Sequence, residues 1–186
     1  GTGSGCIILS ILEDNKSLCA LGIHISYEAI NIAVKNCKNL NLEKKATFIV
    51  SNWLSPICGL YDLIISNPPY IPSKDIDTLS GSVKNYDPLV SLDGGEDGLK
   101  CYREIAEDIT RVISKNGRVI LEIGYNQADD VIKIFESLYG FLFKTNSSIS
   151  SPFSSNLISK NKLLPRPVLF IVFKNCLGII ISVSIF

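Results

Sequence analysis

The sequence has no methionine, a single histidine, a single tryptophan and no net charge. Because position 1 is not methionine, we expect the chain to be a piece of a longer protein. The 18 basic residues balance the 18 acidic ones, so no long-range field favours nucleic acid or an acidic surface. The lone His24 and six scattered cysteines, none in a C-x-x-C pair, give no zinc pattern and indicate reduced thiols in a cytoplasmic protein. We therefore expect no metal, and nucleic acid is not expected as the direct substrate.

The length of the chain and its apolar last segment limit how many domains it can contain and whether it can cross a membrane. The 186 residues suffice for one domain with a full core. The segment from Val168 to Phe186 is nearly all apolar and approaches the length of a bilayer span. Lys174 and Asn175 interrupt it, however, and its Val, Ile and Phe content fits two short buried strands. A membrane is therefore not expected as a partner.

Apolar runs alternate with stretches of helical periodicity along the first three quarters of the chain. The runs are short, rich in β-branched residues and apolar on both faces, which is typical of parallel strands: Ala20 to Ile25, Ala46 to Ser51, Tyr61 to Ser66 and Gly117 to Gly124. Helices are predicted between and after them: Gly5 to Glu13, Ser26 to Asn39, Asp97 to Ser114 and Gln127 to Tyr139. In the second helix, Ile30, Ala33, Val34 and Cys37 are expected on one buried face. The alternation predicts βαβ units and a mostly parallel, doubly wound α/β sheet.

The chain opens with a glycine-rich loop, GTGSG, directly before an apolar helix. Glycines let a backbone turn sharply and pass close to a ligand that faces the amides of the helix N-terminus. A phosphate-binding P-loop is excluded, because Cys6, Ile7 and Ile8 follow where a Gly-Lys-Ser/Thr sequence would be needed. Taken alone, the loop is equally consistent with an ordinary turn into a helix.

A more specific motif, SNPPYIP, follows the strand that ends at Ser66. Pro68 and Pro69 fix the backbone and remove two amide donors, which leaves carbonyl oxygens free to accept. Asn67 adds a side-chain amide, and Tyr70 adds a flat aromatic face. Carbonyl oxygens that hold N–H groups and a ring that stacks on a plane suit a planar nitrogen nucleophile. The loop from Asn67 to Glu96 leaves the carboxyl end of a strand, which is where open α/β sheets bind ligands.

These two motifs and several further segments stand in the order in which a known family has them, and together they carry a resemblance to that family. The other segments are ISYEAINIAVKN (25–36), SNW (51–53), NYDPLVSLDGGEDGLKCYREI (85–105) and LEIGYNQ (121–127). From Gly1 to about Lys144 the chain resembles the HemK/PrmC family of release factor glutamine-N5 methyltransferases. The resemblance implies a Rossmann-like fold, the cofactor S-adenosyl-L-methionine, and a peptide chain release factor whose Gly-Gly-Gln glutamine is methylated.

The resemblance also implies roles for individual residues. The cofactor would contact Gly1, Thr2, Gly3, Ser4, Gly5, His24, Trp53 and Asn67. The substrate glutamine would be held by Asn67, Pro68, Pro69 and Tyr70, of which Asn67, Pro68 and Tyr70 would be catalytic. No general base is expected in this motif.

The chain departs from the family pattern in three places. The family's apolar strand before the glycine-rich loop is missing, so we expect an N-terminally truncated core, residues 1–144, whose sheet lacks its first strand. His24 stands where the family has an acid that accepts the ribose hydroxyls, which predicts weaker cofactor binding. Residues 145–167 read as a serine-rich linker, and residues 168–186 as edge strands or as frame-shifted sequence. Two alternatives therefore stay open: a catalytically dead fragment, and an adenine-N6 DNA methyltransferase, which the zero net charge disfavours.

Overall fold

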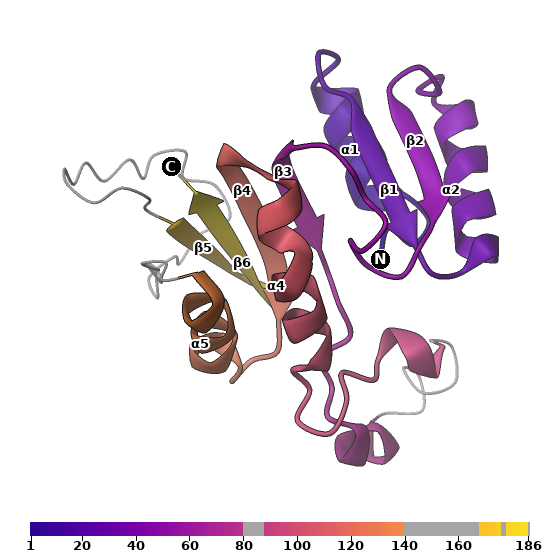
Figure 1. The fold of residues 1–186 in the computed structure, drawn as a ribbon. Coiled ribbons are helices and arrows are strands. Elements are labelled where there is room, and N and C mark those ends of the chain that lie inside the picture. The colour runs from indigo at the N-terminus through magenta and orange to yellow at the C-terminus, as the bar shows by residue number, and fades with distance from the viewer. Residues whose placement is uncertain (80–87, 140–167, 176–177, 186) are drawn as a thin grey trace. The chain divides into compact units, whose positions relative to one another are not determined.

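The computed structural model describes residues 1–79, 88–139, 168–175 and 178–185 (Figure 1). These residues form two compact units, Gly1–Cys58 and Gly59–Phe186. The predicted linker at residues 145–167 lies outside the described residues, and so do residues 80–87 of the long loop. Each unit has a sheet of its own.

The first unit is a two-stranded parallel sheet with two helices. Its elements are α1 (Cys6–Asp14), β1 (Ala20–His24), α2 (Tyr27–Asn39) and β2 (Ala46–Val50). β1 and β2 pair in parallel from Ala20–Ala46 to His24–Val50, so α2 is the crossover of a βαβ unit. Ser26 caps α2, because its Oγ accepts a hydrogen bond from the Ala29 amide at 3.2 Å. All four elements begin and end within one residue of the predicted ranges.

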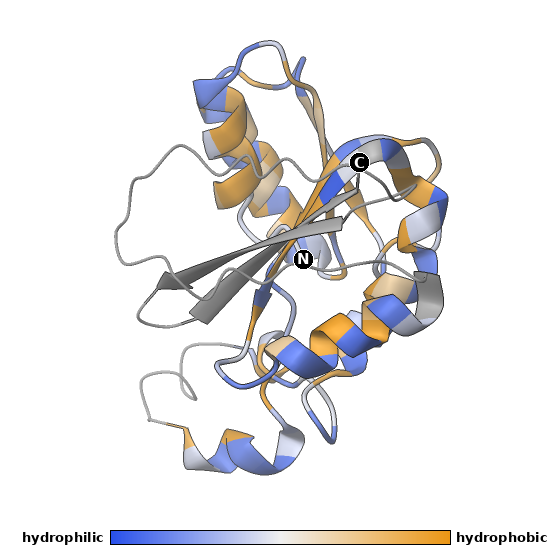
Figure 2. Cartoon of the chain, turned by 90° about the vertical axis from the view of Figure 1, so that its left-hand side faces the viewer, coloured by the Kyte–Doolittle hydropathy of each residue, from blue (hydrophilic) through white to orange (hydrophobic). Residues whose placement is uncertain are grey.

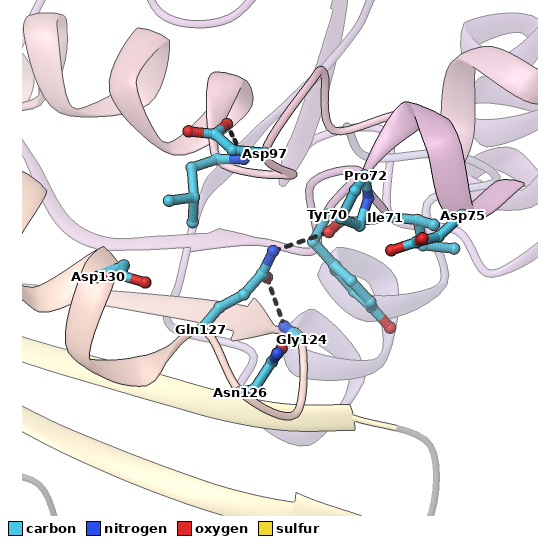
Figure 3. Close-up of a pocket in the computed structure, with 10 residues that line it drawn as sticks. Tyr70, Ile71, Pro72, Asp75, Asp97, Gly124, Asn126, Gln127 and Asp130 are labelled. Atoms are coloured by element: carbon cyan, nitrogen blue, oxygen red, sulfur yellow. Dashed lines mark hydrogen bonds between the residues drawn. The ribbon is translucent and has the colours of Figure 1, made fainter.

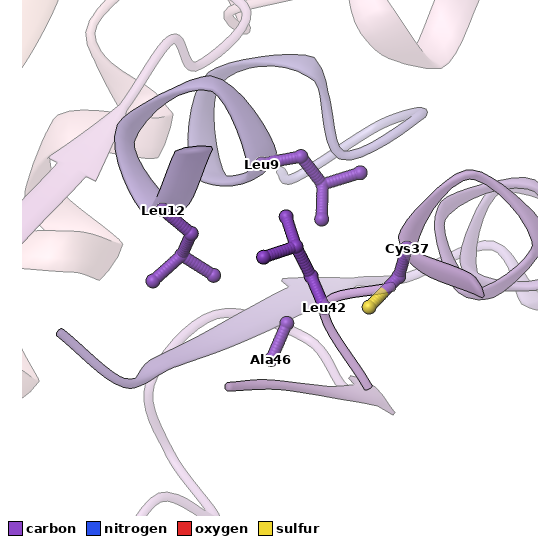
Figure 4. Packing of buried hydrophobic residues seen from close by; sticks show 5 residues of the cluster. All are labelled: Leu9, Leu12, Cys37, Leu42 and Ala46. Carbon is purple, nitrogen blue, oxygen red and sulfur yellow. The ribbon is translucent and has the colours of Figure 1, made fainter. Parts of the chain in front are cut away.

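A small apolar cluster holds the first unit together (Figure 4). It contains Leu9 and Leu12 of α1, Cys37 of α2, Leu42 from the following turn and Ala46 of β2, all buried. The predicted buried face of α2 is confirmed at Ile30, Ala33 and Cys37.

That prediction is wrong for Val34, which is 47% exposed. One residue beyond Ala33, the α-helical turn of about 100° per residue swings Val34 out of the buried stripe. The surface on which α2 packs is the two-stranded β1–β2 sheet, which is too narrow to cover both flanks of the helix.

The second unit contains a four-stranded sheet with the order β3-β4-β6-β5. Its strands are β3 (Tyr61–Ser66), β4 (Ile113–Ile123), β5 (Val168–Asn175) and β6 (Gly178–Ile185). β3 and β4 are parallel, whereas β6 pairs antiparallel with both β4 and β5. The apolar end of the chain therefore forms a β-hairpin added to a parallel pair. Among the described residues, no helix is both long and apolar enough to cross a bilayer.

Two helices pack beside this sheet, and two short 3₁₀ helices occupy the long loop. α4 (Lys100–Val112) and α5 (Ala128–Tyr139) contact each other, and η1 (Ser73–Thr78) and η2 (Leu89–Ser91) follow β3. Hydrophilic and hydrophobic residues alternate along the helices, as expected where one helix face covers a sheet (Figure 2). The apolar residues that recur at helical spacing along α4 and at its two ends are buried: Leu99, Tyr102, Ile105, Ala106, Ile109, Val112 and Ile113.

The predicted end of α4 at Ser114 is wrong, because the helix ends at Val112 and Ile113 already belongs to β4. Ile113 takes an extended conformation and pairs with Tyr61, and the β3–β4 register shifts between Tyr61 and Leu63. A β-branched residue that gains a strand partner favours extended backbone over another helical turn.

The parallel pairs β1–β2 and β3–β4 confirm the predicted α/β class. Among the described residues, β1 pairs with no strand except β2, and β3 pairs with no strand except β4. At the amino end of the chain, the Thr2 amide donates to the Ile23 carbonyl oxygen at 2.7 Å, so a short stretch of backbone runs along the far side of β1.

Candidate functional site

The glycine-rich loop is a tight turn that leads into α1. The Gly5 amide donates to the Thr2 carbonyl oxygen at 3.0 Å and closes the turn. Gly3 and Gly5 have φ angles of +56° and +81°, in the left-handed region that side chains other than glycine rarely adopt. A Cβ on Gly5 would also lie 3.3 Å from the Ala33 Cβ of α2, whereas nothing lies within 4 Å of one on Gly3. The loop therefore rests on α2 at Gly5 and is open at Gly3.

α2 also holds the loop through a polar contact that the sequence did not predict. The Asn36 side-chain amide donates to the Ser4 carbonyl oxygen at 3.0 Å. Ser4 is exposed, and the bond reaches it from a residue far along the sequence. The only sequence signal that marks Asn36 is its place in the segment 25–36, which carries part of the family resemblance.

His24 ends β1 with an unsatisfied side-chain nitrogen. Its Nδ1 is buried and has no hydrogen-bond partner within the described part of the chain, although its carbonyl oxygen accepts from the Ser51 amide at 2.9 Å. Partial burial lowers the pKa of His24, which favours the neutral imidazole. A neutral ring offers one donor and one acceptor at the carboxyl end of a parallel strand.

Trp53 lies in the loop after β2 with a strained backbone. Its φ of +51° is left-handed, which costs on the order of 1–3 kcal/mol for a residue other than glycine. The Ser51 hydroxyl donates to the Trp53 carbonyl oxygen at 3.1 Å and holds this conformation. Strain of this kind clusters at functional sites, which makes Trp53 a candidate site residue. The first unit thus contains Gly1–Gly5, His24 and Trp53.

The Asn67–Tyr70 turn belongs to the second unit and directly follows β3. Asn67 is exposed, Pro68 is fully buried, and Pro69 and Tyr70 are half-buried. Just before the turn, Ser66 Oγ is another buried polar atom that has no partner among the described residues. The buried Pro68 therefore anchors the turn, and Asn67, the first residue of the turn, presents its side-chain amide to solvent.

β4 fixes the ring of Tyr70. The Tyr70 hydroxyl donates to Glu122 Oε1 at 3.3 Å, and the buried Tyr102 donates to the Glu122 carbonyl oxygen at 2.9 Å. Burial and then the negative charge of Glu122 raise the pKa of Tyr70, so the phenol stays protonated and keeps this bond. Sequence reasoning assigned no role to Glu122.

The Asp93–Gly98 loop supports the turn from another side. The Gly94 amide donates to the Ile71 carbonyl oxygen at 2.8 Å, and the Ser73 hydroxyl donates to Asp93 Oδ1 at 2.7 Å. A Cβ on Gly94 would lie 2.8 Å from the Tyr70 Cα, so only glycine lets the two backbones approach this closely. The loop and the turn are thus packed backbone to backbone.

Gln127 joins these segments at a pocket of about 260 Å³ that Gln127 and Tyr70 both line (Figure 3). It accepts from the Gly124 amide and donates to the carbonyl oxygens of Tyr70 and Gly98. Three carboxylates also line the pocket: Asp75, Asp97 and Asp130. Asp97 pairs with Arg103, whose hydrogen bond lowers the pKa of that carboxyl. In the described part of the chain, no group of three or more His, Cys, Asp or Glu side chains is arranged to hold a metal.

Comparison with known proteins gives a consistent result. The family model of the methyltransferase small domain matches residues 1–81. The release factor glutamine methyltransferase of Rhodospirillum rubrum is 44% identical over 136 residues, which are 73% of this chain and 42% of that protein. The enzyme of the same name from Agrobacterium fabrum is 44% identical over 141 residues, 76% of this chain and 48% of that protein. The chain thus spans about half the length of the curated relatives it matches.

A solved structure supports the fold alone. A methyltransferase from Pyrococcus furiosus superposes with a TM-score of 0.63 at 15% identity, covering 99% of this chain and 71% of that one. The sheet and helices described above are therefore those of a methyltransferase fold.

Proposed function

Because the chain belongs to the family of the release factor glutamine methyltransferases and spans about half their length, we propose that it methylates a peptide chain release factor. The methyl group would pass from S-adenosylmethionine to the side-chain nitrogen of the glutamine in a Gly-Gly-Gln motif. The observation that carries the proposal is the turn at Asn67–Tyr70, with its exposed amide, buried proline and fixed aromatic ring.

The first unit offers groups that fit the cofactor. Nδ1 of His24, which has no partner among the residues that the structure describes, is suited to a ribose hydroxyl, and Gly3 leaves open space where a methionine moiety would pass. Trp53 supplies an aromatic face for adenine from the loop after β2. When bound, S-adenosylmethionine supplies an electrophilic methyl group on sulfur.

The turn would act by holding the substrate amide. An amide nitrogen is a poor nucleophile, because its lone pair is delocalised into the carbonyl group. Oxygen atoms of Asn67 and Pro68 would accept its N–H groups and favour the positive charge that develops as the C–N bond forms and the S–C bond breaks. Tyr70 would stack on the amide plane and fix the orientation of the nitrogen. The nitrogen then releases one proton to solvent water, so no residue of the turn is needed as a base.

The test is methyl transfer by the purified 186-residue chain. S-adenosylmethionine is titrated by calorimetry, and a release factor is then incubated with the chain and the cofactor and analysed by mass spectrometry. We expect one added methyl group on the Gly-Gly-Gln glutamine. Asn67→Ala should lower kcat/KM roughly 100-fold, because an oxygen that stabilises developing charge is lost.

The matched control is Asn39→Ala, which makes the same change at an exposed position at the end of α2 and should leave the rate unchanged. Cofactor binding without methyl transfer would contradict the proposal and favour a non-catalytic role. Methylation of adenine in DNA, with none on the release factor, would replace it by the DNA methyltransferase alternative.

A further inference from the structure

Gln127 is buried, with 7% of its surface exposed, and its side chain bonds only to backbone atoms of three separate segments in the described structure. Its Oε1 accepts from the Gly124 amide at 3.0 Å, just after β4. Its Nε2 donates to the Tyr70 carbonyl oxygen at 2.9 Å and to the Gly98 carbonyl oxygen at 3.2 Å. One side chain thus ties the turn after β3 and the loop before α4 to the end of β4.

These partners leave a single orientation for the amide. A backbone N–H can only donate and a carbonyl oxygen can only accept, so the oxygen must face Gly124 and the nitrogen must face Tyr70 and Gly98. Both N–H groups of the amide are used. Glutamine is therefore required here for its two donors and one acceptor at a fixed spacing.

Gln127 also sits where α5 starts. Its carbonyl oxygen accepts from the Val131 amide at 2.9 Å, and its own amide donates to the Gly124 carbonyl oxygen at 3.1 Å. Since the backbone of Gln127 is fixed at the helix start, its side chain can hold Tyr70 at a defined distance from β4.

We propose that Gln127 is a positioning residue that sets the conformation of the Asn67–Tyr70 turn. The inference rests on the proposed function, in which this turn holds the substrate amide. Gln127 touches neither substrate nor cofactor in this scheme. It acts on the carbonyl end of Tyr70, while Glu122 holds the hydroxyl end of the same residue.

Two substitutions separate the hydrogen bonds from the volume of the side chain. Gln127→Glu keeps the shape but replaces the double donor by oxygen, and Gln127→Met fills similar space with no polar group. Both should lower kcat/KM for the release factor by on the order of 100-fold, the effect of a misplacement of about 1 Å, with cofactor affinity unchanged. The Ile71 amide, which donates to the Leu92 carbonyl oxygen at 3.1 Å, should exchange its hydrogen faster in both variants.

A pH profile distinguishes positioning from loss of folded protein. The carboxyl introduced by Gln127→Glu would be buried against the carbonyl oxygens of Tyr70 and Gly98, in a pocket that Asp75, Asp97 and Asp130 also line, so its pKa would be raised. Below that pKa it is protonated and can again donate one hydrogen bond. Gln127→Glu should therefore recover part of its rate as the pH falls, whereas Gln127→Met should not. Circular dichroism at each pH gives the folded fraction, which should stay constant for a positioning role and should follow the rate for a merely structural one.

A pair of glycines gives a second, independent test. Gly98 and Gly59 have φ angles of +75° and +95°, so alanine is strained at both. A Cβ on Gly98 would lie 2.5 Å from the Tyr70 carbonyl oxygen and 2.6 Å from Gln127 Nε2, whereas nothing lies within 4 Å of one on the exposed Gly59. We expect Gly98→Ala to reproduce the loss seen in the Gln127 variants and Gly59→Ala to keep kcat/KM.

Wild-type kcat/KM and unchanged Ile71 exchange in both Gln127 variants would overturn the proposal. If the wild-type chain itself transfers no methyl group, the proposed function fails, and the exchange of the Ile71 amide alone decides about Gln127. Faster exchange in the variants then supports its positioning role, and unchanged exchange rejects it.

Discussion

The imidazole of His24 combines a buried Nδ1, unbonded within the described part of the chain, with a place at the carboxyl end of a parallel strand. A buried polar atom without a partner costs on the order of 1–3 kcal/mol, so the folded protein gains when a ligand supplies one. The neutral ring can serve one ribose hydroxyl, whereas a carboxylate can accept from both. The family resemblance predicts a ribose contact at this position, and the unsatisfied Nδ1 is the structural observation that makes the prediction worth testing.

His24→Asp is accordingly expected to tighten binding of S-adenosylmethionine. A charge-assisted pair of hydrogen bonds in place of a neutral one should stabilise the complex by about 1.4 kcal/mol, or roughly tenfold in Kd by calorimetry. His24→Asn, which is polar but uncharged, is the control and should bind less tightly than the Asp variant. Equal affinities for all three proteins would show that this position does not contact the ribose.

At the scale of elements, α1 links the glycine-rich loop to the core of the first unit. Leu9 and Leu12 project from α1 into the cluster with Cys37, Leu42 and Ala46 (Figure 4). The same helix carries Ile7 on its outer side, 52% exposed. The loop therefore keeps its place only while the inner side of α1 stays packed.

Leu12→Ala should lower the free energy of unfolding by about 2–5 kcal/mol, because Leu12 is 1% exposed and its loss leaves a cavity. Ile7→Ala, on the exposed side of the same helix, should change it by less than about 0.5 kcal/mol. Urea denaturation followed by circular dichroism measures both. Similar losses for the two variants would contradict the packing of α1 described above.

The bounds of a helix or strand can be predicted from the sequence where they depend on residues that are neighbours along the chain. The bounds Tyr61–Ser66 are predicted to the residue, because the apolar run ends at two polar residues, Ser66 and Asn67, that precede two prolines. The contacts of Gln127 and Glu122 with Tyr70 were not predictable, because each joins residues more than fifty positions apart. In the sequence, the segment LEIGYNQ, which contains Glu122 and Gln127, carries only the family resemblance. Periodicity gives the face of a helix, but the partner of a buried polar side chain depends on tertiary structure.

At the scale of the whole molecule, each unit has a strand at the edge of its own sheet. Within the described residues, β1 and β3 are each paired with another strand on one side only, although the Thr2 amide bonds to β1 on its other side. Strand edges with unpaired N–H and C=O groups are templates for pairing with another chain. Leu63 of β3 is also among the exposed large hydrophobic residues, which increases this tendency.

We therefore expect the 186-residue chain to self-associate, with a light-scattering mass that rises with concentration. Leu63→Lys should reduce the association, because a charged side chain on an edge strand opposes pairing. Leu60→Lys introduces the same charge at an exposed position just before β3 and should not reduce it. A monomeric wild-type chain at every concentration, or equal effects of the two variants, would refute this expectation.

Trp53 has a spectroscopic consequence. It is the sole tryptophan of the sequence, and it lies in the Gly1–Cys58 unit on a constrained backbone held by Ser51. Tryptophan emission excited at the red edge of the absorption band therefore originates in the first unit, while the second unit contributes only tyrosine signal. The chain thus carries an intrinsic fluorophore, and it requires no label to follow the first unit separately from the rest.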